Sequence, residues 1–444
     1  MKRMKRICLA LAMMLCAATL LIGCRKETPP PPAETTEAET NTRGEVDTKG
    51  EAQTEPETLP ESDTHGEVGT RGEEPTDPEI IPETEPETVP QCPEYELMKD
   101  GTYAVVGIGT WRDAELIIPA EYNGSPVVKI DMNTEGFLHA AHVTSMTIPA
   151  SVTEIKGTRF SPSLTEIIVD EENPYFASYG GLLYNKELTD LVYCPRGVTS
   201  VTMPDSVTNV GSFAFTECKN LVEIRIPDGV TELGCSTFEG CSSLTTVVFP
   251  ATMTKIAHFS FERCTSLTEI RLPDGLTSVD EGMFFGCVNL TSVVIPEGVT
   301  RIENQVFAGC TSLKTVELPD GVNRICDSAF KDCSGLTSVT IPASVKRIDG
   351  CVFMGCSSLT SIVVPEGVEY LESTAFYNMY GLKSLTIPKS VIHIGRDAWM
   401  DTPALTDIYY AGTEEEWNAL TENVPLVEGT AGYTVHFNCT SGNP

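Results

Sequence analysis

The residues with the most chemical potential are the cysteines, of which this 444-residue chain has 16. Seven of them recur at one constant interval, at Cys218, Cys241, Cys264, Cys287, Cys310, Cys333 and Cys356. Thiols in such number could bind a metal or form disulfides. A zinc site, however, needs four ligands that converge on one point, whereas a fixed interval places these thiols in a line.

A line of thiols favours a structural role. If each interval is one coil of a stack, successive thiols lie about 4.8 Å apart, but parallel side chains point the same way and do not face each other as a disulfide requires. We therefore predict a buried ladder of small apolar thiols, with occasional disulfides or a metal as less favoured alternatives. Near predicted turns and off the ladder, Cys235, Cys326 and Cys351 are better candidates for oxidation.

Other catalytic patterns are missing from the sequence. The six histidines are scattered, and no His-x-x-x-His, Gly-x-Ser-x-Gly or phosphate-binding glycine loop occurs. Carboxylates are abundant, so chance pairs carry little weight for glycosidase chemistry. A net charge of −33 argues against nucleic acid, because phosphate backbones are bound mainly by Lys and Arg. The sequence thus predicts no enzyme, catalytic residue, metal or cofactor.

One cysteine has a specific predicted fate. Basic residues precede an apolar stretch over 7–22, which is typical of an export signal and too short for a stable membrane span. Leu21-Ile22-Gly23-Cys24 then resembles a bacterial lipobox, which implies cleavage before Cys24 and a lipid on its thiol. The alternative is an ordinary signal peptide that contains a cysteine. Each buried methylene adds about 0.8 kcal/mol of membrane affinity, so lipidated Cys24 would anchor the chain.

The composition of residues 24–94 predicts a stalk. Pro, Thr and Glu recur there, and no Phe, Tyr or Trp lies between residues 25 and 94. Such a segment buries too little apolar area to fold and is extended by charge repulsion and proline. A glycosylated stalk is an alternative with the same spacer role.

The rest of the chain repeats with a period of 23 residues, and the repeated structural unit must position any functional side chain. Phe recurs at Phe215, Phe238, Phe261, Phe284, Phe307, Phe330, Phe353 and Phe376, with Trp399 in the next slot. Proline keeps the same interval from Pro204 to Pro388, and leucine from Leu221 to Leu405. A fixed period in this range predicts a solenoid whose units pack only against their neighbours.

Residues 221–233 illustrate one coil. Leu221, Ile224 and Ile226 have the spacing of a short strand with apolar side chains turned inward, which leaves Glu223 and Arg225 facing outward. A Pro-Asp-Gly turn follows.

This pattern resembles the BspA-like leucine-rich repeat proteins, whose repeat reads roughly C-x-x-L-x-x-I-x-L-P-x-x-V-x-x-I-x-x-x-A-F. The resemblance covers about residues 95–444 and includes an irregular opening segment at 100–103. It implies a mainly β fold with little helix, a leucine-rich repeat solenoid of about a dozen coils with a parallel sheet on one face. The predicted divisions are a signal peptide at 1–23, a stalk at 24–94, an N-terminal cap at 95–130, a solenoid at 131–410 (regular from 198) and a C-terminal cap at 411–444.

The two caps have their own signals. Alternating runs at 103–106 and 115–118 predict a β-rich N-terminal cap. At the other end, Thr413 and Glu416 form a capping box that predicts a short helix with Trp417 and Leu420 on one face. A closing strand is predicted over 433–437.

The exposed strand positions are the candidate binding residues. Those we expect to contact a partner are Glu223, Arg225, Glu269, Arg271, Glu317, Thr340, Thr386 and Tyr409. An extended sheet of this kind suits a protein or peptide, and sugar is less favoured because Tyr409 is the single aromatic among the outward positions considered. For any one residue, the alternative is a solvated position that merely suits a β-strand.

Together these features predict a monomeric, lipid-anchored protein of the bacterial cell envelope, exposed outside the cytoplasmic membrane. We expect it to bind proteins or peptides, as in adhesion, and to bind no nucleic acid. The alternatives are a passive surface-layer component and a glycan-binding accessory of an enzyme system.

Overall fold

A computed structural model of the chain describes residues 91–137, 140–157, 160–422 and 432–439. All of them belong to one compact unit, Val89–Pro444. The predicted signal peptide, the lipidation site Cys24 and the stalk up to residue 90 lie outside the described residues. Across the ranges given above, no helix has the length and apolarity to cross a membrane.

The N-terminal part is rich in β-structure, as predicted. Its strands are β1 (Glu94–Leu97), β2 (Tyr103–Gly107), β3 (Glu115–Ile117), β4 (Glu121–Tyr122), β5 (Ser125–Asp131), β6 (Ser145–Ile148), β7 (Glu154–Lys156) and β8 (Glu166–Val169). One sheet has the order β1-β2-β5-β4, with β7 also paired to β5, and a second has the order β3-β6-β8. The first strand begins at Glu94, within the segment that the sequence assigns to the stalk.

An excursion separates this part from the regular coils. It contains β9 (Phe176–Tyr179), β10 (Leu182–Asn185) and β11 (Asp190–Tyr193). The first two form an antiparallel hairpin, and β11 then pairs in parallel with the first short strand of the regular coils. The hairpin is fixed at its base by Asn173, which is fully buried.

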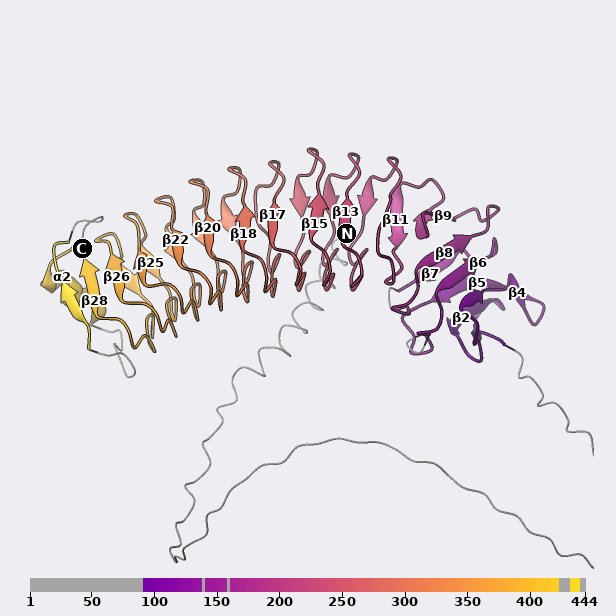
Figure 1. The fold of residues 1–444 in the computed structure, drawn as a ribbon, viewed down its shortest axis with the longest axis horizontal. Coiled ribbons are helices and arrows are strands. Elements are labelled where there is room, and N and C mark those ends of the chain that lie inside the picture. Colours follow the sequence, from indigo (N-terminus) through magenta and orange to yellow (C-terminus); the bar gives the residue numbers. More distant parts are fainter. Residues whose placement is uncertain (1–90, 138–139, 158–159, 423–431, 440–444) are drawn as a thin grey trace, which may run out of the picture. The chain divides into compact units, whose positions relative to one another are not determined.

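The regular coils place one row of strands on a surface that we call the front face. The strands are β13 (Glu223–Arg225), β15 (Thr246–Val248), β17 (Glu269–Arg271), β18 (Ser292–Val294), β20 (Thr315–Glu317), β22 (Ser338–Thr340), β24 (Ser361–Val363), β26 (Ser384–Ile387), β28 (Asp407–Tyr410) and β29 (Thr434–His436). Pairing keeps the register of the repeat, with Glu223 opposite Thr246. Figure 1 shows these coils following one another in a single row.

A second row of parallel strands accompanies the first, which the sequence analysis did not anticipate. It comprises β12 (Asn209–Val210), β14 (Glu232–Leu233), β16 (Lys255–Ile256), β19 (Arg301–Ile302), β21 (Arg324–Ile325), β23 (Arg347–Ile348), β25 (Tyr370–Leu371) and β27 (His393–Ile394). We call the surface it forms the second face. Five of these strands, from β19 to β27, form one continuous sheet, and each turns one apolar side chain inward.

The phenylalanine column forms the centre of the core, as predicted. From Phe215 to Phe376 the rings are fully buried, and successive rings stack with centroids 5.2 to 6.0 Å apart. The leucine column, from Leu221 to Leu405, is fully buried beside it. Each 23-residue repeat therefore forms one coil of a stack, and every coil contributes the same side chains to one continuous core.

The cysteine column is a buried ladder with a hydrogen-bonding role. From Cys241 to Cys356, each thiol donates to the carbonyl oxygen of the phenylalanine 26 residues earlier, at 3.0 to 3.2 Å. Burial raises the pKa of four ladder thiols well above the ordinary value of a cysteine: Cys241, Cys264, Cys310 and Cys356. Each thiol thus satisfies a buried carbonyl and stays protonated.

The C-terminal cap agrees with the predicted helix and strand. Helix α2 (Glu414–Thr421) begins at a capping box in which Thr413 accepts from the Glu416 amide and the Glu416 carboxylate accepts from the Thr413 amide. Trp417 is buried and packs against Trp399 and Tyr410. The helix therefore covers the last coil, and β29 adds a strand to β28.

Candidate binding surface

All eight predicted contact residues lie on the front face. In the three-residue strands the middle side chain turns into the core and the two outer ones face solvent, as in β13 and β17. Six of the eight are exposed, while Thr386 and Tyr409, which lie near the C-terminal cap, are half-buried. The strand spacing therefore brings the equivalent side chains of successive repeats into one continuous row.

Two arginines of the front face pair with carboxylates of their own coils. Arg225 pairs with Asp228 at 3.3 Å and Arg271 with Asp274 at 2.9 Å, so each arginine reaches the turn that follows its own strand. The guanidinium side chains remain 68% and 66% exposed. Because exposed ion pairs contribute little and break easily, both arginines stay available to a partner.

A hollow interrupts the front face between β18 and β20, which belong to different sheets. Its volume is about 440 Å³, and Val294 and Leu318 supply apolar lining while Glu297, Glu317 and Asp320 supply carboxylates. A side chain from a partner could enter here, and one that carries a positive charge would fit the lining best. Glu317 is the predicted contact residue that faces this hollow.

The C-terminal end of the front face contains a residue that the sequence analysis missed. His436 on β29 stacks on Tyr409 with ring centroids 4.8 Å apart, and its Nε2 lies 2.7 Å from Asp407 Oδ1. This contact and the Thr406 hydroxyl hold the pKa of Asp407 below its ordinary value. His436 does not follow the period of the repeat, so the repeat gave no sign that it would extend the row.

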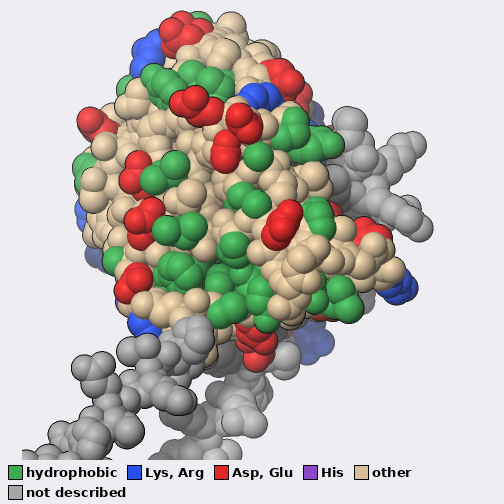
Figure 2. All heavy atoms as spheres, turned by 90° about the vertical axis from the view of Figure 1, so that its right-hand side faces the viewer, with side chains coloured by type: hydrophobic (Ala, Val, Ile, Leu, Met, Phe, Trp, Pro, Cys, Tyr) green, Lys and Arg blue, Asp and Glu red, His purple; other side chains and the backbone are tan. Residues whose placement is uncertain are grey.

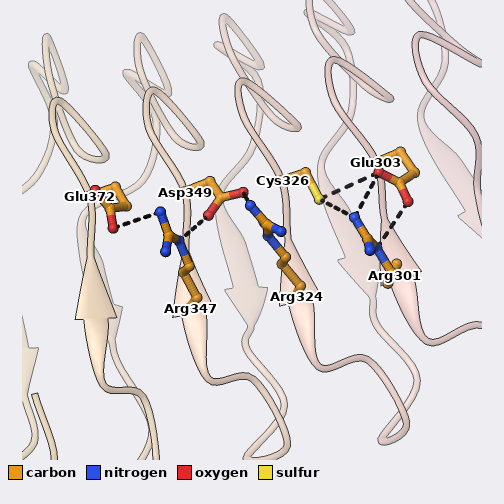
Figure 3. Close-up of polar contacts among 7 residues, drawn as sticks. All are labelled: Arg301, Glu303, Arg324, Cys326, Arg347, Asp349 and Glu372. Atoms are coloured by element: carbon orange, nitrogen blue, oxygen red, sulfur yellow. Dashed lines mark hydrogen bonds and ion pairs between the residues drawn. The ribbon is translucent and has the colours of Figure 1, made fainter.

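The second face carries a charge ladder, drawn in Figure 3 and formed by Arg301, Glu303, Arg324, Arg347, Asp349 and Glu372. The Asp349 carboxylate accepts from both Arg324, at 2.7 Å, and Arg347, at 2.8 Å. Arg347 also reaches Glu372 at 2.9 Å and lies over the Tyr370 ring. These ion pairs connect neighbouring coils. Because carboxylates of the same ladder already neutralise its arginines, the front face is the better candidate for binding.

One acidic side chain between the coils gives the solenoid a pH dependence. Burial, and next the carboxylate of Glu239, raise the pKa of Glu262 to about 7. The unfolded chain ionises this group near pH 4.5, so the contribution of Glu262 to stability falls as pH rises from that value toward 7. We expect Glu262→Gln to stabilise the protein at pH 8 by on the order of 2 kcal/mol relative to its effect at pH 5. Denaturant unfolding of both proteins across this range is the measurement, and a constant difference would contradict the assignment.

The off-ladder cysteines divide into two kinds. Cys235 and Cys351 are half-buried, as their positions near turns suggested. Cys326 is only 2% exposed, and burial raises its pKa to about 11, so it is a poorer candidate for oxidation than expected. Cys326 follows the second-face strand β21, where its thiol contacts Arg301 and Glu303 of the preceding coil, each at 3.6 Å. Over the ranges that the structure covers, no group of three or more His, Cys, Asp or Glu side chains could hold a metal ion.

The N-terminal end also exposes apolar side chains. Figure 2 looks onto this end and shows hydrophobic side chains gathered among scattered carboxylates. Exposed members of the N-terminal part and the excursion are Leu97, Ile117, Ile168, Tyr175 and Tyr179. Two of them, Ile117 and Ile168, lie in line across the sheet β3-β6-β8, with Thr147 between them.

The geometry defines the class of protein: a parallel β-solenoid built from leucine-rich repeats, with about 14 turns and an exposed strand face. The family model described as BspA type Leucine rich repeat region (6 copies) matches residues 186–304 and 280–406. The repeat region of this chain therefore belongs to the BspA-type leucine-rich repeat family. Solenoids of this kind are typically binding or structural proteins, because their repeats create extended surfaces.

Solved structures resemble the chain over most of its length. A leucine-rich cell surface protein from Faecalibacterium prausnitzii is 28% identical, with 73% of this chain and 95% of that one covered and a TM-score of 0.48. A leucine-rich repeat protein from Bacteroides ovatus is 22% identical, with coverage of 79% and 99% and a TM-score of 0.49. One from Eubacterium ventriosum is 23% identical, with coverage of 60% and 64% and a TM-score of 0.42. No curated protein matches the sequence.

Proposed function

We propose that the chain is a bacterial surface protein whose front face binds a protein or peptide, as in adhesion. The observation that carries the proposal is the row of outward side chains, in which Arg225 and Arg271 offer exposed positive charges. Further along the same row, Glu317 lines a hollow that has both apolar and carboxylate side chains. Membership of a family with surface members is consistent with this role.

Binding through the front face predicts a specific loss. The double variant Arg225→Glu, Arg271→Glu should capture roughly tenfold less partner from bacterial and host surface extracts, since it replaces attraction by repulsion. The matched control is Arg396→Glu, an exposed arginine outside the front row, which should capture as much as the unchanged chain. Immobilised full chain and quantitative mass spectrometry of the bound proteins provide the comparison.

Two outcomes would redirect the proposal. Equal capture by all three proteins would exclude the arginines as contacts. Lack of any specific capture by the unchanged chain would favour a passive role in the surface layer.

We further propose that Cys24 is lipidated and that the acidic segment between it and β1 holds the solenoid away from the membrane. The support is the sequence of residues 21–24 and the export signal before it. Cys24→Ser should move the protein from the membrane fraction to the soluble exported fraction, because acyl chains supply the anchor. Fractionation followed by immunoblotting measures this, and retention of Cys24→Ser in the membrane fraction would contradict lipid anchoring at this residue.

A further inference from the structure

Two thiols face each other where the excursion meets the first regular coil. Cys194 follows β11, Cys218 begins the cysteine column, and their Sγ atoms lie 3.9 Å apart. Both are buried, at 2% and 0% exposure. We propose that Cys194 and Cys218 form a reversible disulfide that joins the end of the excursion to the first regular coil of the solenoid.

This pair differs from the ladder thiols in its hydrogen bonds. From Cys241 onward each ladder thiol donates to a phenylalanine carbonyl at 3.0 to 3.2 Å. Cys194 and Cys218 share instead the carbonyl oxygen of Pro195, at 3.6 and 3.7 Å. These two contacts are long, so little holds either thiol away from the other.

The sequence interval explains why the two sulfur atoms approach. The interval from Cys194 to Cys218 is one residue longer than the repeat, so Cys194 leaves the parallel register in which ladder thiols point the same way. A disulfide needs sulfur atoms about 2.05 Å apart. Closing the gap from 3.9 Å therefore requires the two side chains to rotate toward each other.

The surroundings of the pair favour local opening, which a reagent needs in order to reach buried thiols. The Tyr184 and Tyr193 hydroxyls and Arg196 Nε are buried without a hydrogen-bond partner, and both tyrosines lie close enough to Cys194 to interact with it electrostatically. Unpartnered buried polar groups carry a free-energy penalty. A segment with several of them is therefore expected to open more readily than the regular core.

The pair also lies at a boundary between two cores. Tyr193 packs in the N-terminal core, whereas the next residue, Cys194, packs with Cys218 in the core of the regular coils. Both cysteines belong to the second of these cores, so a covalent bond here would hold the chain that leaves the excursion against the first regular coil. We therefore expect oxidation to raise the temperature at which the unit unfolds.

The chemistry requires a disulfide as the oxidant. In the opened state one of the two thiols loses its proton, and the thiolate attacks a sulfur of a small disulfide such as oxidised glutathione, releasing one glutathione thiolate. The second cysteine then attacks the mixed disulfide and releases the other. Two S–H bonds are lost and one S–S bond forms in the protein, while the two electrons and two protons end on the two released glutathione thiols.

The test treats the folded full chain with oxidised glutathione, blocks the remaining thiols in acid and maps links by mass spectrometry of peptides. The expected result is a link between Cys194 and Cys218, reversed by a reducing thiol. Cys241 and Cys264 serve as the matched control, because they are neighbouring ladder thiols that both donate to carbonyls.

Variants separate a specific bond from general oxidation. Oxidation should raise the midpoint of thermal unfolding of the unchanged chain and leave that of Cys194→Ala unaltered. The proposal would be overturned by a link that forms only after passage through denaturant, by links at Cys241 and Cys264 in equal yield, or by no link at all. If Cys194→Ala does not fold, the peptide map of the unchanged chain still decides.

Discussion

Phe307→Ala should lower the free energy of unfolding of the solenoid by about 3 to 5 kcal/mol. The Phe307 ring is fully buried and stacks between Phe284, at 5.7 Å, and Phe330, at 5.3 Å. Its removal leaves a cavity in the middle of the stack and breaks two ring contacts. Because each coil packs only against its neighbours, no distant element can move in to fill the space.

The matched control for this variant is Val294→Ala on the front face. Val294 is 48% exposed, so its truncation should change the free energy by no more than about 0.5 kcal/mol. Denaturant unfolding followed by circular dichroism compares the two. A loss below about 1 kcal/mol for Phe307→Ala would mean that the phenylalanine column does not carry the core.

Asn173→Ala should lower the free energy of unfolding by about 2 to 4 kcal/mol, since it leaves buried backbone groups without partners. The Asn173 side-chain amide donates to the carbonyl oxygens of Pro149, at 2.9 Å, and Val152, at 3.0 Å. Its oxygen accepts from the amides of Tyr175 and Phe176, both at 2.9 Å. One side chain thus fixes the base of the excursion to the coil before it.

Two further substitutions test this explanation. Asn173→Asp keeps an acceptor for the two amides but loses both donors and buries a charge, so it should be at least as destabilising at neutral pH. Asn289→Ala removes an exposed side-chain hydrogen bond to Thr265 and should cost no more than about 0.5 kcal/mol. Equal losses for Asn173→Ala and Asn289→Ala would contradict the role of the buried amide.

The repeat determined most of what sequence could predict. The columns of Phe, Leu and Cys, the outward row from Glu223 to Tyr409 and the capping box at Thr413 are local or periodic, and the structure places them as expected. A constant period fixes which side chains share a face, because every coil repeats the same path.

Features that depend on contacts between different coils were not predictable in this way. The second face arises from strands of two residues, too short to show alternation in the sequence. The acceptor of each ladder thiol belongs to the preceding coil, 26 residues away. Arg225 has acidic residues on both sides in sequence, and only the geometry shows that it pairs with Asp228.

Cys194 and His436 were missed for a related reason. Each lies off the period of the repeat, the first by one residue in the excursion and the second in the closing strand. Tertiary structure brings them beside Cys218 and Tyr409. Both lie where the repeat begins or ends, so a search for period alone overlooks the residues that join the solenoid to its caps.

The most direct test of the front face as the binding surface is chemical labelling of carboxylates in the full chain, with and without a captured partner. Both faces offer carboxylates, so each serves as the reference for the other. We expect the partner to protect Glu223, Glu269 and Glu317 on the front face and to leave Glu303 and Glu372 on the second face as reactive as before. Protection of Glu303 and Glu372 with unchanged labelling of the front-face carboxylates would contradict the account.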